Sequence, residues 1–582
     1  MKKLLSLIVT LGMLGTLALA EAPRDTFVLQ TLPGGPVSLD PARAYDSASG
    51  IIIQNVYETL YTYDGESIDV FVPLLATGYT TSDDGLTWNF DLREGVQFHS
   101  GNTMTCKDVE WSYEYGMVVA HPEGAGVYLA GDPLIGQHTT DGSDPAAYQE
   151  LVDFATIDGA VECPDGPDGL TVQFNFQMPE PAFIAIQAYG AFSIIDSQYA
   201  IENGMWDGTE ATWVDWIGRD ITQEFLHSNM SGTGAYKLVS SDNQQTIAER
   251  FDDYWGGAPA LKNAVVQYVD EQSSRILALQ QGDADEVSIN ERSELVKLRG
   301  AEGVSVLEDP NWGTTGNTIV FFTFDVDTEN NEDVGCGELG CGIPSNFFDD
   351  VNVRRGFAHL FDQQAFIDQL YEGNGSVVTM GLPPGFMGYN ADIDVRTLDF
   401  EAAEEAFRAA HGGAVWENGF EFTAIHNAGN TTRQTALEII AENLAFVHPD
   451  FKMNVRSLPW ADFLARTAEQ KVPMFALGWG ADYADPKNFI DVYYSNAGFY
   501  SARTAIDLPE IQELIDQANS TSDQAEREAL YKAVGPLHYD LAPLIVLPQQ
   551  NPFMTVRSDL QGVYRNAMLS SGNRYLWKDV SK

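Results

Sequence analysis

Strand-like and helical patterns interleave along the whole of this 582-residue chain. Polar and apolar residues alternate at 87–92 and 171–176, which is typical of half-buried strands. Apolar residues recur at helical spacing over 274–281, 353–371, 432–446 and 508–518. This order favours α/β lobes over an all-β sandwich. A chain of this length is expected to divide into roughly two to four lobes.

The N-terminal segment has the pattern of a cleaved signal peptide. Two lysines at 2–3 precede an apolar run at 4–17, and a small-x-small cleavage site ends at Ala20. We expect residues 1–20 to be removed and the mature protein to be periplasmic or secreted. A membrane anchor is the alternative, but the run is short, and no other segment has about 18 uninterrupted apolar residues.

The composition is strongly acidic, with 84 acidic and 32 basic side chains and a formal charge of −52. This balance excludes a nucleic-acid binder that neutralises phosphates, because no excess of lysine and arginine exists. The acidic residues are spread along the chain, and we interpret them as an exported surface adapted to a salty medium. Hydrophobic residues make up 44% of the chain, enough to bury a core.

Four cysteines in an exported chain predict two disulfides, with three possible pairings. Cys336 and Cys341 are close in sequence, so a clip between them would leave Cys106 to pair with Cys163. A zinc site is the alternative. Zinc would require histidine beside the thiolates, and no histidine lies near either end of the Cys336–Cys341 loop.

Common catalytic and metal-binding motifs are absent from the sequence: the zinc-protease His-Glu-x-x-His, the phosphate-binding Gly-Lys-Ser/Thr loop and the Gly-x-Ser-x-Gly elbow. Residues 335–340 fit Gly-x-Gly-x-x-Gly, but an acidic run precedes them and a proline follows where a helix should begin. Asp325, Asp327 and Glu329 alternate as calcium ligands do, yet Asn330 replaces the turn glycine, which favours a solvated loop. We therefore expect no enzyme, cofactor or resident metal.

Several short blocks together resemble the signature of one family. They are Val56-Tyr57-Glu58-Thr59-Leu60, the segment 92–101 (LREGVQFHSG) with 105–109, and the blocks at 232–236, 254–257, 281–285 and 353–358. The blocks resemble the extracellular solute-binding proteins of the oligopeptide/dipeptide-binding family of ABC importers. They occur in the family's order over nearly all of the mature chain.

The resemblance implies an α/β, two-lobed clamshell fold of the type II periplasmic binding proteins. Lobe I is expected to comprise 21–287 and 551–582, with an extra subdomain at about 71–200, and lobe II to comprise 288–550. Such a protein is expected to act as a monomer. It would capture a solute between its lobes and deliver it to ABC permease subunits in the inner membrane.

The block 478–486 (GWGADYADP) is similar to the family segment in which an aspartate pairs with the α-ammonium of a bound peptide. The matching residue is Asp482. A carboxylate buried in a closing cleft needs a cationic partner, and a peptide N-terminus supplies three donors. On the residues alone, an aspartate that caps a turn before Pro486 is the alternative.

Other ligand contacts are implied by the same resemblance. Trp479 and Trp460 match aromatic residues that line side-chain pockets, and Gly478 and Gly480 match positions where the backbone approaches the ligand. Arg433 lies near the place where some dipeptide binders hold the ligand carboxylate.

Tyr45 and Asp46 match the first-lobe edge beside the ligand. The sequence thus predicts a binding protein for short peptides. An oligosaccharide, an opine or a metal chelate is the alternative ligand, and an exported hydrolase is the alternative class.

Overall fold

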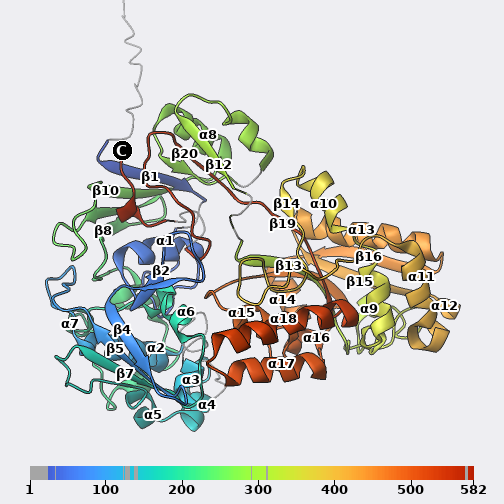
Figure 1. Ribbon diagram of the computed structural model, residues 1–582, viewed down its shortest axis with the longest axis horizontal. Coiled ribbons are helices and arrows are strands. Elements are labelled where there is room, and N and C mark those ends of the chain that lie inside the picture. Colours follow the sequence, from blue (N-terminus) through green and yellow to red (C-terminus); the bar gives the residue numbers. More distant parts are fainter. Residues whose placement is uncertain are drawn as a thin grey trace, which may run out of the picture.

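The structure is a computed structural model that describes residues 24–32, 35–121, 124, 131–136, 142–289, 292–309, 312, 314–569 and 575–582. The expected signal peptide, residues 1–20, lies outside the described residues. Figure 1 shows two bodies side by side, one containing the blue segments and the C-terminus and the other containing the yellow, orange and most of the red segments. We call them the first body and the second body.

A seven-stranded sheet forms one part of the first body. Its strand order is β12-β20-β11-β1-β10-β9-β8. The bounds are β1 Thr26–Thr31, β8 Tyr236–Ser241, β9 Gln245–Arg250, β10 Asn263–Tyr268, β11 Glu286–Val287, β12 Val304–Glu308 and β20 Phe553–Arg557. Because β20 pairs with both β11 and β12, the end of the chain returns to this sheet. Strand β12 lies within the range 288–550 that was predicted for lobe II, although it pairs with β20 in this sheet. The lobe boundaries at 287 and 550 stay a prediction.

A four-stranded antiparallel sheet, β4-β5-β7-β6, forms the other part of the first body. The strands are β4 Ala76–Thr81, β5 Thr87–Leu92, β6 Val161–Glu162 and β7 Thr171–Asn175. The alternation predicted two of these strands correctly, because Trp88, Phe90 and Leu92 of β5 and Val172 and Phe174 of β7 are buried at every second position.

The second body contains a five-stranded mixed sheet of order β16-β15-β17-β13-β18. Its strands are β13 Gly316–Phe322, β15 Phe420–Asn427, β16 Phe451–Leu458, β17 Met474–Gly480 and β18 Leu544–Val546. β17 lies between β15 and β13, and its first four residues are all buried. Such a continuous apolar run is typical of a central strand that is covered on both faces. Two-residue and three-residue strands form small sheets: β2 Tyr61–Tyr63 with β3 Phe71–Pro73, and β14 Gly375–Ser376 with β19 Gln549–Gln550.

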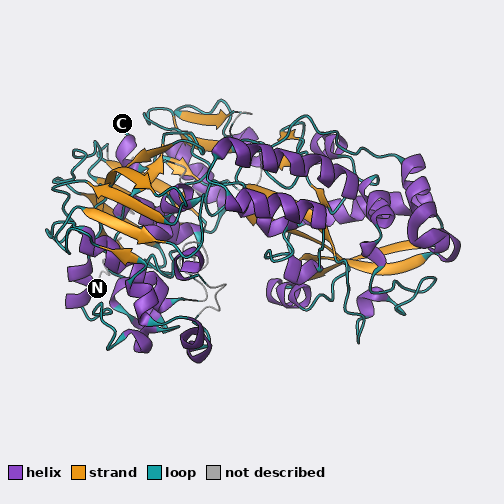
Figure 2. Cartoon of the chain, turned by 60° about the horizontal axis from the view of Figure 1, so that its bottom comes forward, coloured by secondary structure: helices purple, strands orange, loops and turns teal. Residues whose placement is uncertain are grey.

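Helices cover the strands in both bodies (Figure 2). In the first body they are α1 Ser47–Val56, α2 Cys106–Val119, α3 Asp132–Ile135, α4 Pro145–Leu151, α5 Phe154–Asp158, α6 Phe183–Gln187, α7 Ser197–Glu202 and α8 Gln272–Gln281. In the second body they are α9 Val351–Ala358, α10 Gln363–Leu370, α11 Phe400–Ala409, α12 Ala414–Asn418, α13 Thr431–Val447, α14 Trp460–Ala468, α15 Lys487–Tyr494, α16 Ser501–Thr504, α17 Pro509–Ser520 and α18 Gln524–Leu541.

Three of the four helices expected from the spacing correspond to α8, α13 and α17. The stretch 353–371 was expected to be one helix and instead contains α9 and α10. The break has a local cause, because the Asp362 side chain accepts from the backbone N–H of Ala365 and caps a new helix start.

Each body buries its own apolar core. The first core gathers Phe27, Trp88, Phe174, Tyr236 and Trp577 among others, and the second gathers Phe321, Phe357, Ile440, Phe475 and Tyr531 among others. Trp577, near the C-terminus, therefore belongs to the body that contains β1. Tyr483 follows β17 in the second sheet but packs in the first core, so its loop joins the two bodies.

Both disulfides expected from the cysteine spacing are present. Cys106 pairs with Cys163, and Cys336 pairs with Cys341. Within the described ranges no group of His, Cys, Asp or Glu side chains is arranged to hold a metal ion. In the same part of the chain, no helix combines the length and the apolar character needed to cross a membrane.

Removal of the two disulfides is expected to have unequal effects on stability. Cys106 and Cys163 are 57 positions apart and Cys336 and Cys341 are 5 apart. Because loop closure restricts the unfolded chain more for the longer loop, the double alanine variant of the first pair should lose about 4 kcal/mol of unfolding free energy and that of the second about 2 kcal/mol. Urea unfolding followed by circular dichroism measures both losses, and a larger loss for the second pair would contradict the prediction.

Candidate functional site

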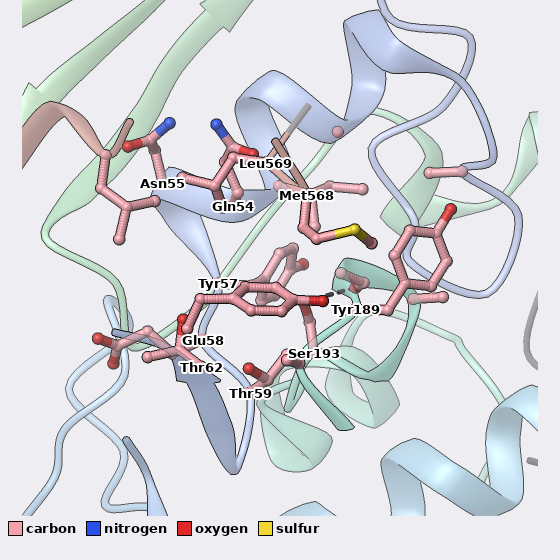
Figure 3. A pocket seen from close by; sticks show the side chains of 18 of the residues that line it. Gln54, Asn55, Tyr57, Glu58, Thr59, Thr62, Tyr189, Ser193, Met568 and Leu569 are labelled. Atoms are coloured by element: carbon pink, nitrogen blue, oxygen red, sulfur yellow. Dashed lines mark hydrogen bonds between the residues drawn. The ribbon is translucent and has the colours of Figure 1, made fainter. Parts of the chain in front are cut away.

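A cavity of about 410 Å³ lies between the two bodies. The first body contributes α1 and the residues after it, the turn at 188–193, and the C-terminal segment that includes Met568 and Lys578. The second body contributes Thr315 and the residues from Gly480 to Asp482. The volume is within the usual range of small-molecule sites, roughly 300–1,000 Å³. Figure 3 shows Met568 and Leu569 facing Tyr57 and Thr59 across this cavity.

Asp482 places a buried carboxylate in the wall of the cavity. The Tyr45 hydroxyl donates to Asp482 Oδ1 at 2.6 Å, and Asn488 Nδ2 donates to Oδ2 at 3.3 Å. The side chain is 8% exposed, and burial raises the pKa of its carboxyl while the two hydrogen bonds oppose that shift. Among the described residues, no lysine or arginine forms an ion pair with Asp482.

The loop that carries Asp482 is held by a buried ion pair. Arg527 of α18 donates from Nη1 to Asp485 Oδ2 and from Nη2 to Asp485 Oδ1, each at 2.8 Å. Arg527 is 0% exposed and Asp485 is 6% exposed. Asp485 also accepts from the backbone N–H of Lys487, the first residue of α15. Arg527 of α18 therefore holds the turn between β17 and α15 in place.

A second ion pair joins the two bodies next to this loop. Lys487 Nζ lies 2.7 Å from Glu180 Oε2 of the first body, and Glu180 is 2% exposed. Burial alone would lower the pKa of Lys487, but the charges of Glu180 and Asp491 raise it above its usual value. Lys487 therefore stays charged in this contact.

Glu58 forms part of the first-body wall, but its carboxylate is already occupied. Tyr254 donates to Oε1 at 2.7 Å, and Thr233 and Trp255 donate to Oε2 at 2.8 Å each. Burial raises the pKa of this carboxyl, and the three donors oppose the shift. Glu58 therefore fixes the wall that presents Tyr57 and Thr59.

The predicted site residues fall into two groups. Tyr45, Asp46, Gly480 and Asp482 line the cavity. Asp46 turns its carboxylate toward α1, where Oδ1 accepts from the backbone N–H groups of Ala48 and Ser49. Its carboxylate is therefore a helix N-cap, and the ligand contact implied by the resemblance stays a prediction.

Trp479, Gly478, Trp460 and Arg433 are not among the residues that line this cavity. Trp479 packs its ring 5.1 Å from Phe499 and donates from Nε1 to Asn488 Oδ1 at 3.3 Å. The Gly478 carbonyl accepts from the Tyr500 hydroxyl at 2.7 Å. Both residues therefore stabilise the interior of the second body next to the loop that carries Asp482.

Arg433 lies beside Gly478, where an added Cβ would stand 3.1 Å from Arg433 Nη2, and Trp460 begins α14 in the same body. Arg433 Nη1 donates to Asn427 Oδ1 at 2.8 Å, and burial lowers the pKa of its guanidinium. Trp460 is 52% exposed and packs against Phe463 on the same helix. Their ligand-binding roles stay predictions.

Several cavity residues were not singled out in the sequence. Tyr57 and Thr59 lie in the recognised block 56–60, so a signal for them existed, although no role was assigned. Tyr189, Met568 and Lys578 had no such signal. Met568 and Lys578 reach the cavity because β20 carries the end of the chain back to the first body, a pairing that no local pattern reveals.

The comparison with protein families identifies the class of the chain. The model described as "Bacterial extracellular solute-binding proteins, family 5 Middle" matches residues 70–501. This match covers well over half of the chain, so the chain belongs to this family. The resemblance seen in the sequence blocks is thereby confirmed, as is the expectation of a binding protein in place of an enzyme.

Relatives extend over nearly the whole chain. Heme-binding protein A of Haemophilus influenzae is 24% identical over 551 residues, covering 93% of this chain and 90% of that protein. The dipeptide-binding protein of Escherichia coli is 23% identical over 527 residues, covering 86% and 87%. The solved structure of the periplasmic binding protein DppA from Helicobacter pylori with the peptide STSA has a TM-score of 0.66 at 23% identity, covering 96% of this chain and 98% of that one. This likeness confirms the expected α/β periplasmic-binding-protein fold.

The Arg527–Asp485 pair gives a testable prediction for stability. Arg527→Met should lower the free energy of unfolding by about 3–5 kcal/mol, because it leaves the buried Asp485 carboxylate without its partner. Lys532→Met is the matched control on the same helix, since Lys532 forms an exposed pair with Glu528 and its loss should cost less than about 1 kcal/mol. Urea unfolding of both variants measures the difference, and equal losses would argue against the anchoring role.

Proposed function

We propose that this family 5 solute-binding protein captures short peptides with a free amino terminus and passes them to the permease subunits of an ABC importer. In this proposal the lobes predicted at 21–287 with 551–582 and at 288–550 close over the peptide. The observation that carries the proposal is the buried Asp482 carboxylate, which faces the interbody cavity and has no cationic partner among the described residues.

The chemistry of Asp482 favours an ammonium ligand. Each of its carboxylate oxygens accepts one hydrogen bond, so each has further acceptor capacity. A buried charge is costly unless it is paired, and a peptide α-ammonium brings one positive charge and three donors. A neutral sugar would leave the charge of Asp482 unbalanced.

The backbone near Asp482 suits an extended peptide. β17 pairs with β13 along its whole length but with β15 only at Met474 and Phe475. The part of β17 that leads to Gly480 and the cavity therefore has one edge without a paired strand among the described residues. A peptide main chain can add to such an edge, with Gly480 allowing close approach.

Other solutes remain alternatives within the family, since one relative is named as a heme-binding protein. Asp482 favours a ligand with an amine over an oligosaccharide or a metal chelate, whereas an opine that retains an amine would also suit it. A second hollow of about 530 Å³ lies beside β11 and β20. We favour the first cavity because it contains four of the predicted site residues and this second hollow contains none.

The ammonium contact can be tested with two forms of one ligand set. A random tripeptide library with free amino termini should bind the wild-type protein, whereas the N-acetylated library should bind roughly 100-fold more weakly, since a desolvated ion pair is lost. Asp482→Asn should abolish this preference. The exposed Asp462→Asn, on α14 of the same body, should retain it. Native mass spectrometry reports the bound peptides, and a variant Asp482→Asn that still prefers free amines would overturn the proposal.

The raised pKa of Asp482 predicts a pH dependence of binding. The charged carboxylate binds the ammonium, so affinity should be high above the pKa and should fall as the pH drops through it. Because burial raises this pKa, the fall should begin at a higher pH than an exposed aspartate would give. Calorimetric titrations from about pH 7 to about pH 4 measure the effect. Loss of affinity in the same pH range for the Asp482→Asn variant would show that another group is responsible.

A further inference from the structure

We infer that Lys578 binds the terminal carboxylate of the peptide at the end of the cavity opposite Asp482 and so makes the site selective for ligands with a free acid group. This inference rests on the proposed function, because it assumes that a peptide ammonium occupies Asp482. It assigns the acidic end of the ligand to a residue four positions from the C-terminus of the chain.

The charges of the cavity wall single out Lys578. Among the described residues that line the cavity, it is the only lysine, arginine or histidine. Arg433, which the sequence resemblance placed near a ligand carboxylate, does not line the cavity and donates to Asn427. Within the described part of the wall, a ligand carboxylate therefore has one cationic side chain to contact.

The position of Lys578 is fixed by its neighbours. The backbone N–H of Trp577 donates to Asn55 Oδ1 at 2.8 Å, and the Trp577 side chain is fully buried in the first core. Lys578 Nζ donates to Asp579 Oδ1 at 2.7 Å, and Asp579 Oδ2 accepts from the Tyr564 hydroxyl at 2.9 Å. The lysine side chain is 31% exposed, so it is held in place but is not enclosed.

The ammonium of Lys578 has N–H donors beyond the one that contacts Asp579. An ammonium carries three N–H donors, and the bond to Asp579 uses one of them. Glu58 is a candidate for a competing partner, because the charge of Lys578 opposes the burial that raises the pKa of Glu58. Three other side chains already donate to the Glu58 carboxylate, and no hydrogen bond joins it to Lys578. A ligand carboxylate can therefore approach the lysine.

The two charged residues lie toward opposite ends of α1. Asp482 contacts Tyr45, which precedes the helix, and Lys578 follows the residue bonded to Asn55 near the end of the helix. A ten-residue helix is about 15 Å long. In Figure 3, Asn55 and Tyr189 lie on opposite sides of the cavity, and the Tyr189 ring packs 6.4 Å from Tyr45.

This spacing indicates the length of the ligand. An extended peptide advances about 3.4 Å per residue, so roughly three to four residues span the helix. The ligand whose charges complement both residues is then a short zwitterionic peptide, with its ammonium on Asp482 and its carboxylate on Lys578. Internal segments of longer chains lack a carboxylate at this point, so the site should discriminate against them.

The test compares ligands that differ only at their carboxyl end. A random tripeptide library with free carboxylates and the same library with C-terminal amides are titrated into the wild-type protein and into Lys578→Met, which keeps the length of the side chain. The wild type should prefer the free acids by roughly 10- to 100-fold, the effect of one charge-assisted contact. Lys578→Met should bind acids and amides equally, with the affinity that the wild type shows for amides.

Two controls separate this inference from the proposed function. Lys532→Met removes an exposed, paired lysine near the middle of α18, outside the cavity wall, and should keep the full preference for acids. Asp482→Asn should weaken acids and amides alike. A Lys578→Met variant that keeps the preference, or a wild type that binds acids and amides equally, would overturn the inference alone. A wild type that binds neither library would overturn the peptide function and the inference with it.

Discussion

The buried pair of Arg527 and Asp485 is the interaction on which the interbody site depends. It fixes the turn between β17 and α15, and this turn carries three contacts to the first body: Asp482 to Tyr45, Tyr483 into the first core, and Lys487 to Glu180. A bidentate pair restrains both distance and orientation, which a single hydrogen bond does not. The geometry of the cavity therefore depends on a salt bridge that touches no ligand.

Two charged residues of the cavity differ from the charged residues that anchor its walls in how fully their hydrogen-bonding positions are occupied. Asp485, Glu180 and Glu58 each have their oxygens matched by donors, and these residues stabilise the walls. Asp482 and Lys578 retain acceptor and donor capacity on surfaces that face the cavity. Asp482 has no cationic partner among the described residues, and Lys578, although paired with Asp579, keeps further N–H donors, so the cavity is suited to a ligand with an ammonium and a carboxylate.

Local sequence patterns predicted the elements, and the recognised blocks predicted the fold. Strand β5 and helix α13 were visible because burial imposes a period on a single segment. The division of 353–371 into α9 and α10 was missed because one capping aspartate outweighed continuous apolar spacing. Half of the predicted site residues line the cavity, and Asp482 among them is placed by pairing across 437 positions. The position of Lys578 at the cavity could not be predicted from the sequence, because it depends on β20 returning to β11, a pairing that sequence periodicity does not encode.

The hydrogen bond between Tyr45 and Asp482 also bears on how ligand binding and closure are coupled. It crosses between the bodies, so it favours the arrangement in which the two bodies are together. A ligand shifts such an equilibrium only by the difference between its affinities for the closed and open arrangements. A peptide that contacts Asp482 on the second body and Lys578 on the first gains both ion pairs only when the bodies are together. The two charged ends therefore favour closure more strongly than either contact alone.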